Sequence, residues 1–273
     1  MGSSPLTAHD GELLAFLADH RVALAGHLQV ATGLSPSALR RRLRALVRAG
    51  LVAERQLLHR QPAAYLITRR GLGAIGSPLP RPELRLQGYV HDLGTAWLWL
   101  AARDGAFGPV RELLSERQLR SHDGLPRNPE AAPAGRQSER FAVRLFALGP
   151  GGRERLHYPD LLLHSPDGRR VALELELTAK SGARLERILA GYATDRRFDA
   201  VVYVVGDDRI EAKVRDVAAR AAASDKVFVH RFAWTPSMQG LAAQLGHASA
   251  RGRTMVRGRS RRAATASQRG PAR

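Results

Sequence analysis

Several residue types and patterns are missing from this chain of 273 residues. There is no cysteine, which excludes a disulfide-stapled scaffold and a cysteine-ligated zinc site. No apolar run approaches the roughly 20 residues that cross a bilayer, and the first residues lack the pattern of a signal peptide. No sequence period repeats, which excludes solenoids and propellers. We therefore expect a cytoplasmic protein with no membrane contact.

Acidic residues are few relative to basic ones. The chain has 43 Lys and Arg against 25 Asp and Glu, a formal net charge of +18, and only three of the basic residues are lysine. A field of this sign attracts polyanions, so nucleic acid is the first partner to consider. An arginine-rich composition also follows from a GC-rich coding sequence, and this alternative stays open.

Composition divides the chain into four segments. Residues 1–76 have the pattern of short helices followed by a strand pair, and three prolines within residues 77–82 indicate a linker. Residues 83–247 alternate helical and strand-like patterns, which predicts a second, α/β domain. Residues 248–273 hold eight arginines, no acid and almost no large apolar residue, which predicts a disordered tail.

The first segment has the pattern of a winged helix-turn-helix. Ser35 followed by Pro36 is a favoured start of a helix, and Gly50 ends it. The basic turn at residues 59–62 would be the wing, and Tyr65–Gly71 resembles the second wing strand of many bacterial winged-helix regulators. The expected elements are helices over residues 12–20, 22–31 and 36–49 and strands over residues 51–58 and 63–71.

The third of these helices has an apolar stripe and a basic face. Leu39 and Leu43 belong to the stripe, while arginines recur every four residues on the other side. In a winged helix the third helix enters the major groove and the wing reaches the backbone or the minor groove. The expected partner is double-stranded DNA, although a solvated helix face or a protein-binding module would share this pattern. The candidate DNA-binding residues are Arg40, Arg41, Arg44, Arg48 and Arg60.

A hairpin with opposed acids is expected over residues 157–180. Residues 165–168, Ser-Pro-Asp-Gly, suit a type I turn with a left-handed last residue, and the resulting register places Asp160 opposite Glu174. Alternation along the strand puts Glu176 on the same face, and Lys180 as well if the strand runs that far. The other face is rich in leucine and is expected to be core.

Opposed carboxylates destabilise a strand pair unless something neutralises them, and Mg²⁺ or Mn²⁺ prefers carboxylate oxygens. We therefore expect a metal held by Asp160 and Glu174. A site that polarises a phosphodiester would use Asp160, Glu174, Glu176 and Lys180 as catalytic residues. The alternative is a solvated outer hairpin face. His91 and Glu116 are candidates for a further site residue.

The order of elements around the hairpin resembles the PD-(D/E)XK nuclease fold, a mixed α/β sheet, with Pro159-Asp160 and Glu174 as its motif acids. Glu176 stands where that family usually has lysine. This departure puts catalysis in question but does not affect the expected fold. The expected helices and strands besides the hairpin cover residues 83–103, 110–114, 182–194, 198–206, 211–223 and 226–232.

A set of short phrases runs through the chain after the N-terminal helices: His91-Asp-Leu, Ser115-Glu-Arg-Gln-Leu-Arg120, Pro159-Asp-Leu-Leu-Leu, Leu173-Glu-Leu-Glu-Leu-Thr178 and Tyr192. Together with the N-terminal winged-helix pattern they make nearly the whole chain similar to the replication-relaxation family of actinobacterial plasmids and integrative elements. In that family the segment that matches Leu173–Thr178 often has Glu-x-Asp-x-x-Thr. The resemblance implies a DNA-binding protein of a mobile element that acts in plasmid replication or transfer initiation, with replication or conjugation proteins as further partners. The alternative is an inactive nuclease fold that serves as a DNA-bound docking protein or transcriptional regulator.

Overall fold

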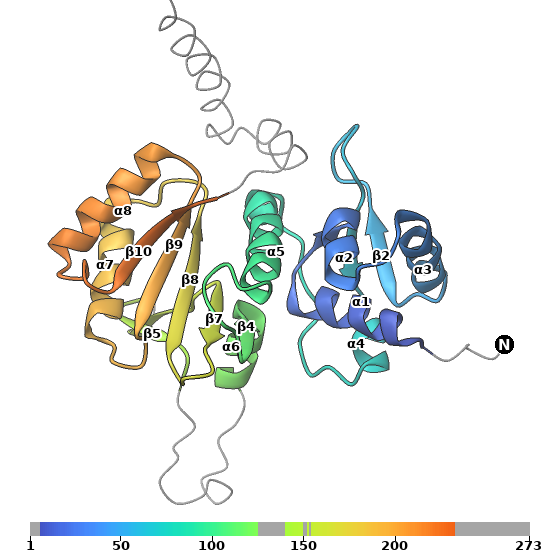
Figure 1. Ribbon diagram of the computed structural model, residues 1–273, viewed down its shortest axis with the longest axis horizontal. Helices are drawn as coiled ribbons and strands as arrows, with labels where there is room; N and C mark the ends of the chain where they lie inside the picture. Colours follow the sequence, from blue (N-terminus) through green and yellow to red (C-terminus); the bar gives the residue numbers. More distant parts are fainter. Residues whose placement is uncertain (1–5, 125–139, 150–151, 153, 233–273) are drawn as a thin grey trace, which may run out of the picture.

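The computed structural model describes residues 6–124, 140–149, 152 and 154–232. Within these residues the chain forms eight α-helices, a short 3-10 turn and ten strands, so the fold is mixed α/β as expected (Figure 1). The tail predicted over residues 248–273 lies outside the described residues. None of the described helices is both long and apolar enough to cross a membrane.

The N-terminal unit, residues 6–76, combines four helices with a small antiparallel sheet of strand order β1-β3-β2. Its first helix starts before residue 12 because Thr7 and Asp10 form a capping box. The predicted start of the second helix was wrong, since Ala23 and Leu24 pair with β3 as a strand. The elements are α1 (Ala8–Asp19), β1 (Ala23–Leu24), α2 (Ala25–Thr32), α3 (Pro36–Arg48), β2 (Val52–Arg55), β3 (Ala64–Ile67) and α4 (Arg69–Ala74).

Helix α3 begins and ends as its sequence predicts. The Ser35 hydroxyl accepts a hydrogen bond from the backbone N–H of Ala38 at 3.3 Å, and Pro36 occupies the first turn. Gly33 closes α2 in the left-handed conformation, with a φ of +67°, so the chain turns tightly into α3. The buried side of the helix consists of Leu39, Leu43 and Leu46.

The rest of the chain builds a five-stranded mixed sheet of order β10-β9-β8-β7-β4. Strands β8, β9 and β10 are parallel, while β7 is antiparallel to both β8 and β4. Strands β5 and β6 form a separate two-stranded ribbon. The elements are η1 (Leu86–Gly88), α5 (Tyr89–Arg103), β4 (Glu112–Ser115), α6 (Glu116–Gly124), β5 (Val143–Leu148), β6 (Glu154–His157), β7 (Leu161–His164), β8 (Arg170–Glu176), α7 (Gly182–Thr194), β9 (Ala200–Val205), α8 (Asp208–Arg220) and β10 (Val227–Arg231).

Two features of this part differ from the sequence-based expectation. The helix predicted over residues 83–103 reaches α-helical conformation only at Tyr89, because Gly88, a poor helix former, is its N-cap. Helix α6 and the ribbon β5-β6 were not predicted. These elements are short, and the few residues of each define no clear hydrophobic period.

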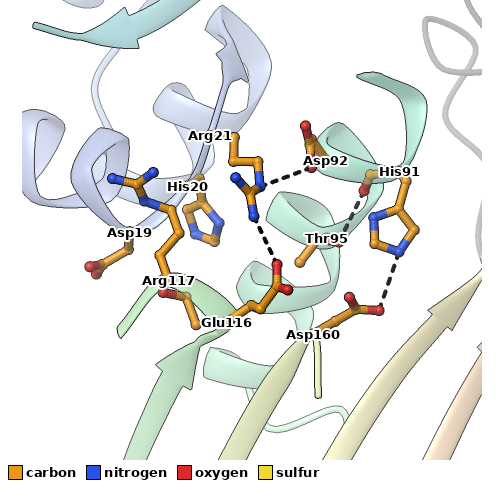
Figure 2. A pocket seen from close by; sticks show the side chains of 10 residues that line it. Asp19, His20, Arg21, His91, Asp92, Thr95, Glu116, Arg117 and Asp160 are labelled. Carbon is orange, nitrogen blue, oxygen red and sulfur yellow. Dashed lines mark hydrogen bonds and ion pairs between the residues drawn. The ribbon is translucent and has the colours of Figure 1, made fainter. Parts of the chain in front are cut away.

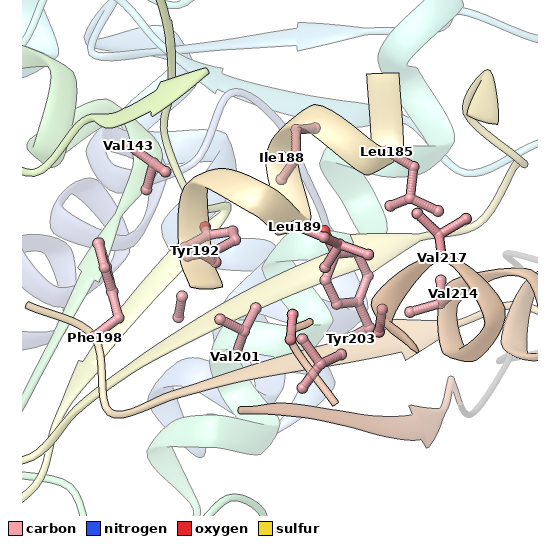
Figure 3. Packing of buried hydrophobic residues seen from close by; sticks show 14 of the residues in the cluster. Val143, Leu185, Ile188, Leu189, Tyr192, Phe198, Val201, Tyr203, Val214 and Val217 are labelled. Carbon is pink, nitrogen blue, oxygen red and sulfur yellow. The ribbon is translucent and has the colours of Figure 1, made fainter. Parts of the chain in front are cut away.

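Helices cover both faces of the five-stranded sheet (Figure 1). Helix α5 packs on the face that carries Leu173 and Leu175, so the leucine-rich face of the hairpin is core, as predicted. Helices α7 and α8 pack on the other face (Figure 3). That acidic face is therefore buried too, with Glu174 and Glu176 only 1% and 3% exposed, and the alternative of a solvated outer face is wrong.

Helix α5 also contacts the N-terminal unit. Trp97 packs against the core of that unit, and the His27 ring of α2 lies with Nε2 at 3.1 Å from the carbonyl oxygen of Leu93. Within residues 77–82, the expected linker, Leu79 is buried in the same core. The N-terminal unit and the sheet therefore pack against each other through α5.

Candidate functional site

The outer side of α3 carries arginines that lack acidic partners. Arg42, whose side chain turns toward α1, donates its Nε–H to Asp10 Oδ1 at 2.9 Å and ties α3 to α1. The other arginines of the helix are exposed, and in the part of the chain that the structure describes none of them forms an ion pair with a carboxylate. These residues are Arg40, Arg41, Arg44 and Arg48.

Arg60 lies in the turn between β2 and β3, where it is exposed. Its backbone adopts a left-handed conformation with a φ of +58°. The turn is closed by the side-chain amide of Gln56, which donates to the carbonyl oxygens of Leu58 and Gln61 at 2.8 and 2.6 Å. The predicted basic turn is thus a structured loop that presents its arginine to solvent.

The hairpin β7-β8 has the register that its turn predicts. The ladder ends with Leu161 paired with Leu173, so Asp160 and Glu174 are the next residues on the two sides of this pair. Gly168 donates its N–H to the carbonyl oxygen of Ser165 at 3.0 Å and has a φ of +87°. The predicted turn and register of the hairpin are therefore present in the structure.

Asp160 is paired with a histidine of α5. Its Oδ2 accepts a hydrogen bond from the N–H of Leu175 at 2.8 Å and lies 3.3 Å from His91 Nε2 (Figure 2). Burial opposes the charged carboxylate, but His91 and Lys180 lower the pKa of Asp160 to about 2. Burial likewise opposes the charged imidazole, but Asp160 raises the pKa of His91 to about 9. At neutral pH the two side chains form an ion pair.

Glu174 is enclosed by two hydrogen-bond donors from other elements. Its Oε1 lies 2.6 Å from His157 Nε2, at the end of β6, and accepts a hydrogen bond from the Tyr192 hydroxyl of α7, also at 2.6 Å. Burial and the charge of Glu174 raise the pKa of Tyr192 well above its ordinary value, so this hydroxyl keeps its proton. Each of the two acids thus has its own hydrogen-bond partners: His91 for Asp160, and His157 and Tyr192 for Glu174.

Lys180 joins the acids by a route that differs from the expected one. Strand β8 ends at Glu176, so alternation does not carry Lys180 onto the acidic face. Instead the chain turns back, the backbone N–H of Lys180 donates to Glu176 Oε1 at 2.9 Å, and the ammonium group pairs with Glu176 Oε2. Burial disfavours the charged ammonium, but the three acids together raise the pKa of Lys180.

The predicted metal can be compared with this arrangement. The three carboxylates have the hard oxygen donors that Mg²⁺ or Mn²⁺ prefers. Among the described residues, however, no three His, Asp or Glu side chains converge as a ready-made metal site. A cation at Asp160 and Glu174 would compete with His91 and His157 for the carboxylate oxygens. The donor chemistry fits, and the divalent metal stays a prediction.

A second polar network lies beside Asp160, between the N-terminal unit and the sheet (Figure 2). Arg21, between α1 and β1, pairs with Glu116 at 3.0 Å and with Asp92 of α5 at 3.6 Å. Burial raises the pKa of Asp92 to about 6 even though His91 and Arg21 lower it. Arg117 donates its Nε–H to the carbonyl oxygen of Ala18 at 2.9 Å. Glu116, which the sequence analysis named as a candidate site residue, therefore links the N-terminal unit to the domain that contains the five-stranded sheet.

Some residues of the site were not assigned from the sequence. His157 and Arg21 carry no local pattern that separates them from other basic residues, since their partners come from distant parts of the chain. Comparison with protein-family models, with curated proteins and with solved structures gives no match for this chain.

Proposed function

We propose that this protein binds double-stranded DNA through the arginine side of α3 and the turn between β2 and β3. The observation that carries the proposal is the set of exposed arginines on α3 with no carboxylate partner among the described residues. Like charges four residues apart repel by a few tenths of a kcal/mol, and a surface selected only for solubility would intersperse acids. A bound polyanion removes this repulsion.

The order of elements supports the proposal. The N-terminal unit has three helices followed by a hairpin, with a third sheet strand between the first two helices, and this order is compatible with a winged helix-turn-helix. In that fold the third helix enters the major groove, where arginine reads guanine edges or holds phosphates. The net charge of +18 favours the encounter.

The test is the salt dependence of duplex binding by the variant R40A/R44A/R48A. Each arginine–phosphate interaction that the substitutions remove should lower the slope of log affinity against log salt by about 0.9, so the slope should fall by roughly 2 to 3. At 0.1 M salt the affinity should fall on the order of 100-fold. Fluorescence anisotropy with a labelled duplex, repeated over a salt series, measures both quantities.

The control is Arg220→Ala, which removes an exposed arginine of α8 that pairs with Asp216. Its slope should stay within about 1 unit of the wild-type value, because this substitution can remove at most one interaction with a phosphate. An unchanged slope in R40A/R44A/R48A would place the DNA-binding surface elsewhere on the chain.

The resemblance to replication-relaxation proteins supports a narrower proposal. The DNA would belong to a plasmid or integrative element, and the protein would act when replication or transfer begins. Without cleavage activity the second domain would serve as a docking platform or as part of a transcriptional regulator. The order of helices and strands around hairpin β7-β8 is compatible with the PD-(D/E)XK plan.

A second candidate function is DNA cleavage with a divalent metal. The observation that favours it is the position of the Lys180 ammonium group. This group pairs with Glu176, and its positive charge lowers the pKa of Asp160. A lysine beside acidic metal ligands can orient a nucleophile or stabilise developing charge. When bound, the metal would polarise the phosphodiester and lower the pKa of bound water.

Cleavage of supercoiled and single-stranded DNA with Mg²⁺ or Mn²⁺ tests this function. In Asp160→Asn and Lys180→Met the cleavage rate should fall by at least about 100-fold, as is usual for loss of a charge at a reacting centre. Asp167→Asn, an exposed acid at the hairpin turn, is the control and should cleave as the wild type does. Tight duplex binding without any cleavage would instead favour the docking or regulatory role.

A further inference from the structure

Large apolar side chains are exposed together on the ribbon β5-β6. Phe146 and Leu148 of β5 are 67% and 72% exposed, and Leu156 of β6 is also exposed. Arg144 pairs with Leu156 across the ribbon, so a charged and an apolar side chain stand side by side. The exposed patch belongs to a two-stranded ribbon with no third strand among the described residues. Exposed apolar side chains that lie close together are one feature of binding surfaces.

The ribbon and the C-terminal end of α7 border a pocket that contains both Phe146 and several arginines. Two of these arginines are paired with acids inside the pocket, Arg144 with Glu154 and Arg197 with Asp195. The other two, Arg140 and Arg196, form no ion pair with a carboxylate within the described ranges. The pocket therefore combines an exposed aromatic ring with an excess of positive charge.

The ribbon is seated firmly on α7. Val143 is fully buried beside Tyr192 (Figure 3). Gly191 of α7 approaches the ribbon so closely that a Cβ there would lie 2.6 Å from the carbonyl oxygen of Arg144. At this same end His157 of β6 pairs with Val143 across the ribbon and contacts Glu174 of the acidic site. The patch thus has a fixed position relative to the acids.

We propose that this pocket binds single-stranded nucleic acid, with an unpaired base stacked on Phe146 and the adjacent phosphates near Arg140 and Arg196. A solvent-exposed aromatic ring beside unpaired guanidinium groups complements a chain that alternates bases with phosphates. Bases within a duplex are already stacked and cannot cover the ring. Phe146 also has a φ of +47°, a conformation that non-glycine residues rarely adopt and that is concentrated at functional sites. This function is separate from duplex binding at α3.

The test compares two labelled probes of equal length and charge, oligothymidylate and a chain of abasic deoxyribose phosphates, by fluorescence anisotropy. Stacking contributes roughly 1–3 kcal/mol per base, so Phe146→Ala should weaken oligothymidylate binding on the order of 10-fold and leave the abasic chain unaffected. Phe146→Trp should restore the affinity. Phe228→Ala, which removes another half-exposed phenylalanine from strand β10, is the matched control and should change neither probe.

The variant R140A/R196A should weaken both probes equally, since phosphates are common to them. Equal affinity of wild type and Phe146→Ala for oligothymidylate would overturn the proposal, as would an equal loss for the abasic chain. A competition experiment adds polyglutamate at a carboxylate concentration equal to the phosphate concentration of the oligothymidylate. If polyglutamate displaces the oligothymidylate, the pocket binds acidic peptides instead. Duplex binding depends on α3, so failure of R40A/R44A/R48A to weaken the duplex is a separate result.

Discussion

Replacing Gly71 with alanine should destabilise the N-terminal unit by roughly 3 kcal/mol or more, because overpacking against rigid atoms is costly. A Cβ at Gly71 would lie 2.2 Å from the carbonyl oxygen of Leu51 and 2.8 Å from Ile67 Cγ1. The Leu51 oxygen cannot move freely, since it accepts hydrogen bonds from the backbone and hydroxyl of Thr68. Chemical denaturation measures the loss, and duplex affinity should fall with the folded fraction.

Gly73→Ala is the matched control for this prediction. Gly73 lies in the same helix, α4, and an added Cβ there would have no neighbour within 4 Å. Alanine has the higher helix propensity, so this variant should be stabilised by up to about 1 kcal/mol. Equal stabilities of the two variants would show that α4 does not pack on Leu51 as closely as the structure indicates.

Acidification should destabilise the protein through His27, which lies wholly inside it. Its Nδ1 accepts a hydrogen bond from the N–H of Leu24 at 3.0 Å, so the proton is on Nε2, which faces the Leu93 carbonyl oxygen. Burial lowers the pKa of His27 from 6.5 to about 4. Between these values the unfolded chain binds a proton that the folded chain excludes, so stability is complete above pH 6.5 and is lost as the pH falls to 4.

The expected loss over this range is about 3 kcal/mol. Other groups titrate in the same range, so the measured quantity is the difference in unfolding free energy between wild type and His27→Gln at each pH. Glutamine can accept and donate a hydrogen bond but does not titrate. The wild type should lose its advantage over His27→Gln as the pH falls, whereas a constant difference between the two proteins would contradict the buried neutral imidazole.

Turn and capping residues made parts of the fold predictable. Ser35 and Pro36 start α3, and the turn at Ser165 and Gly168 sets the register of β7 and β8, because these interactions join residues that are close in sequence. The ribbon β5-β6 and helix α6 were not predicted because short elements have little periodicity of their own. Packing on α7, through Gly191, holds the ribbon in place.

The sequence by itself determined which side chains stand together when their positions depend on helical or strand periodicity. This applies to the arginine side of α3 and to Asp160 opposite Glu174. The sequence named His91 as a candidate, but only the tertiary structure decided which side chain neutralises which acid: His91 reaches Asp160 from α5, and Tyr192 reaches Glu174 from α7. The order of the strands and the helices packed on each face bring these residues together, and neither is encoded in the spacing of nearby residues.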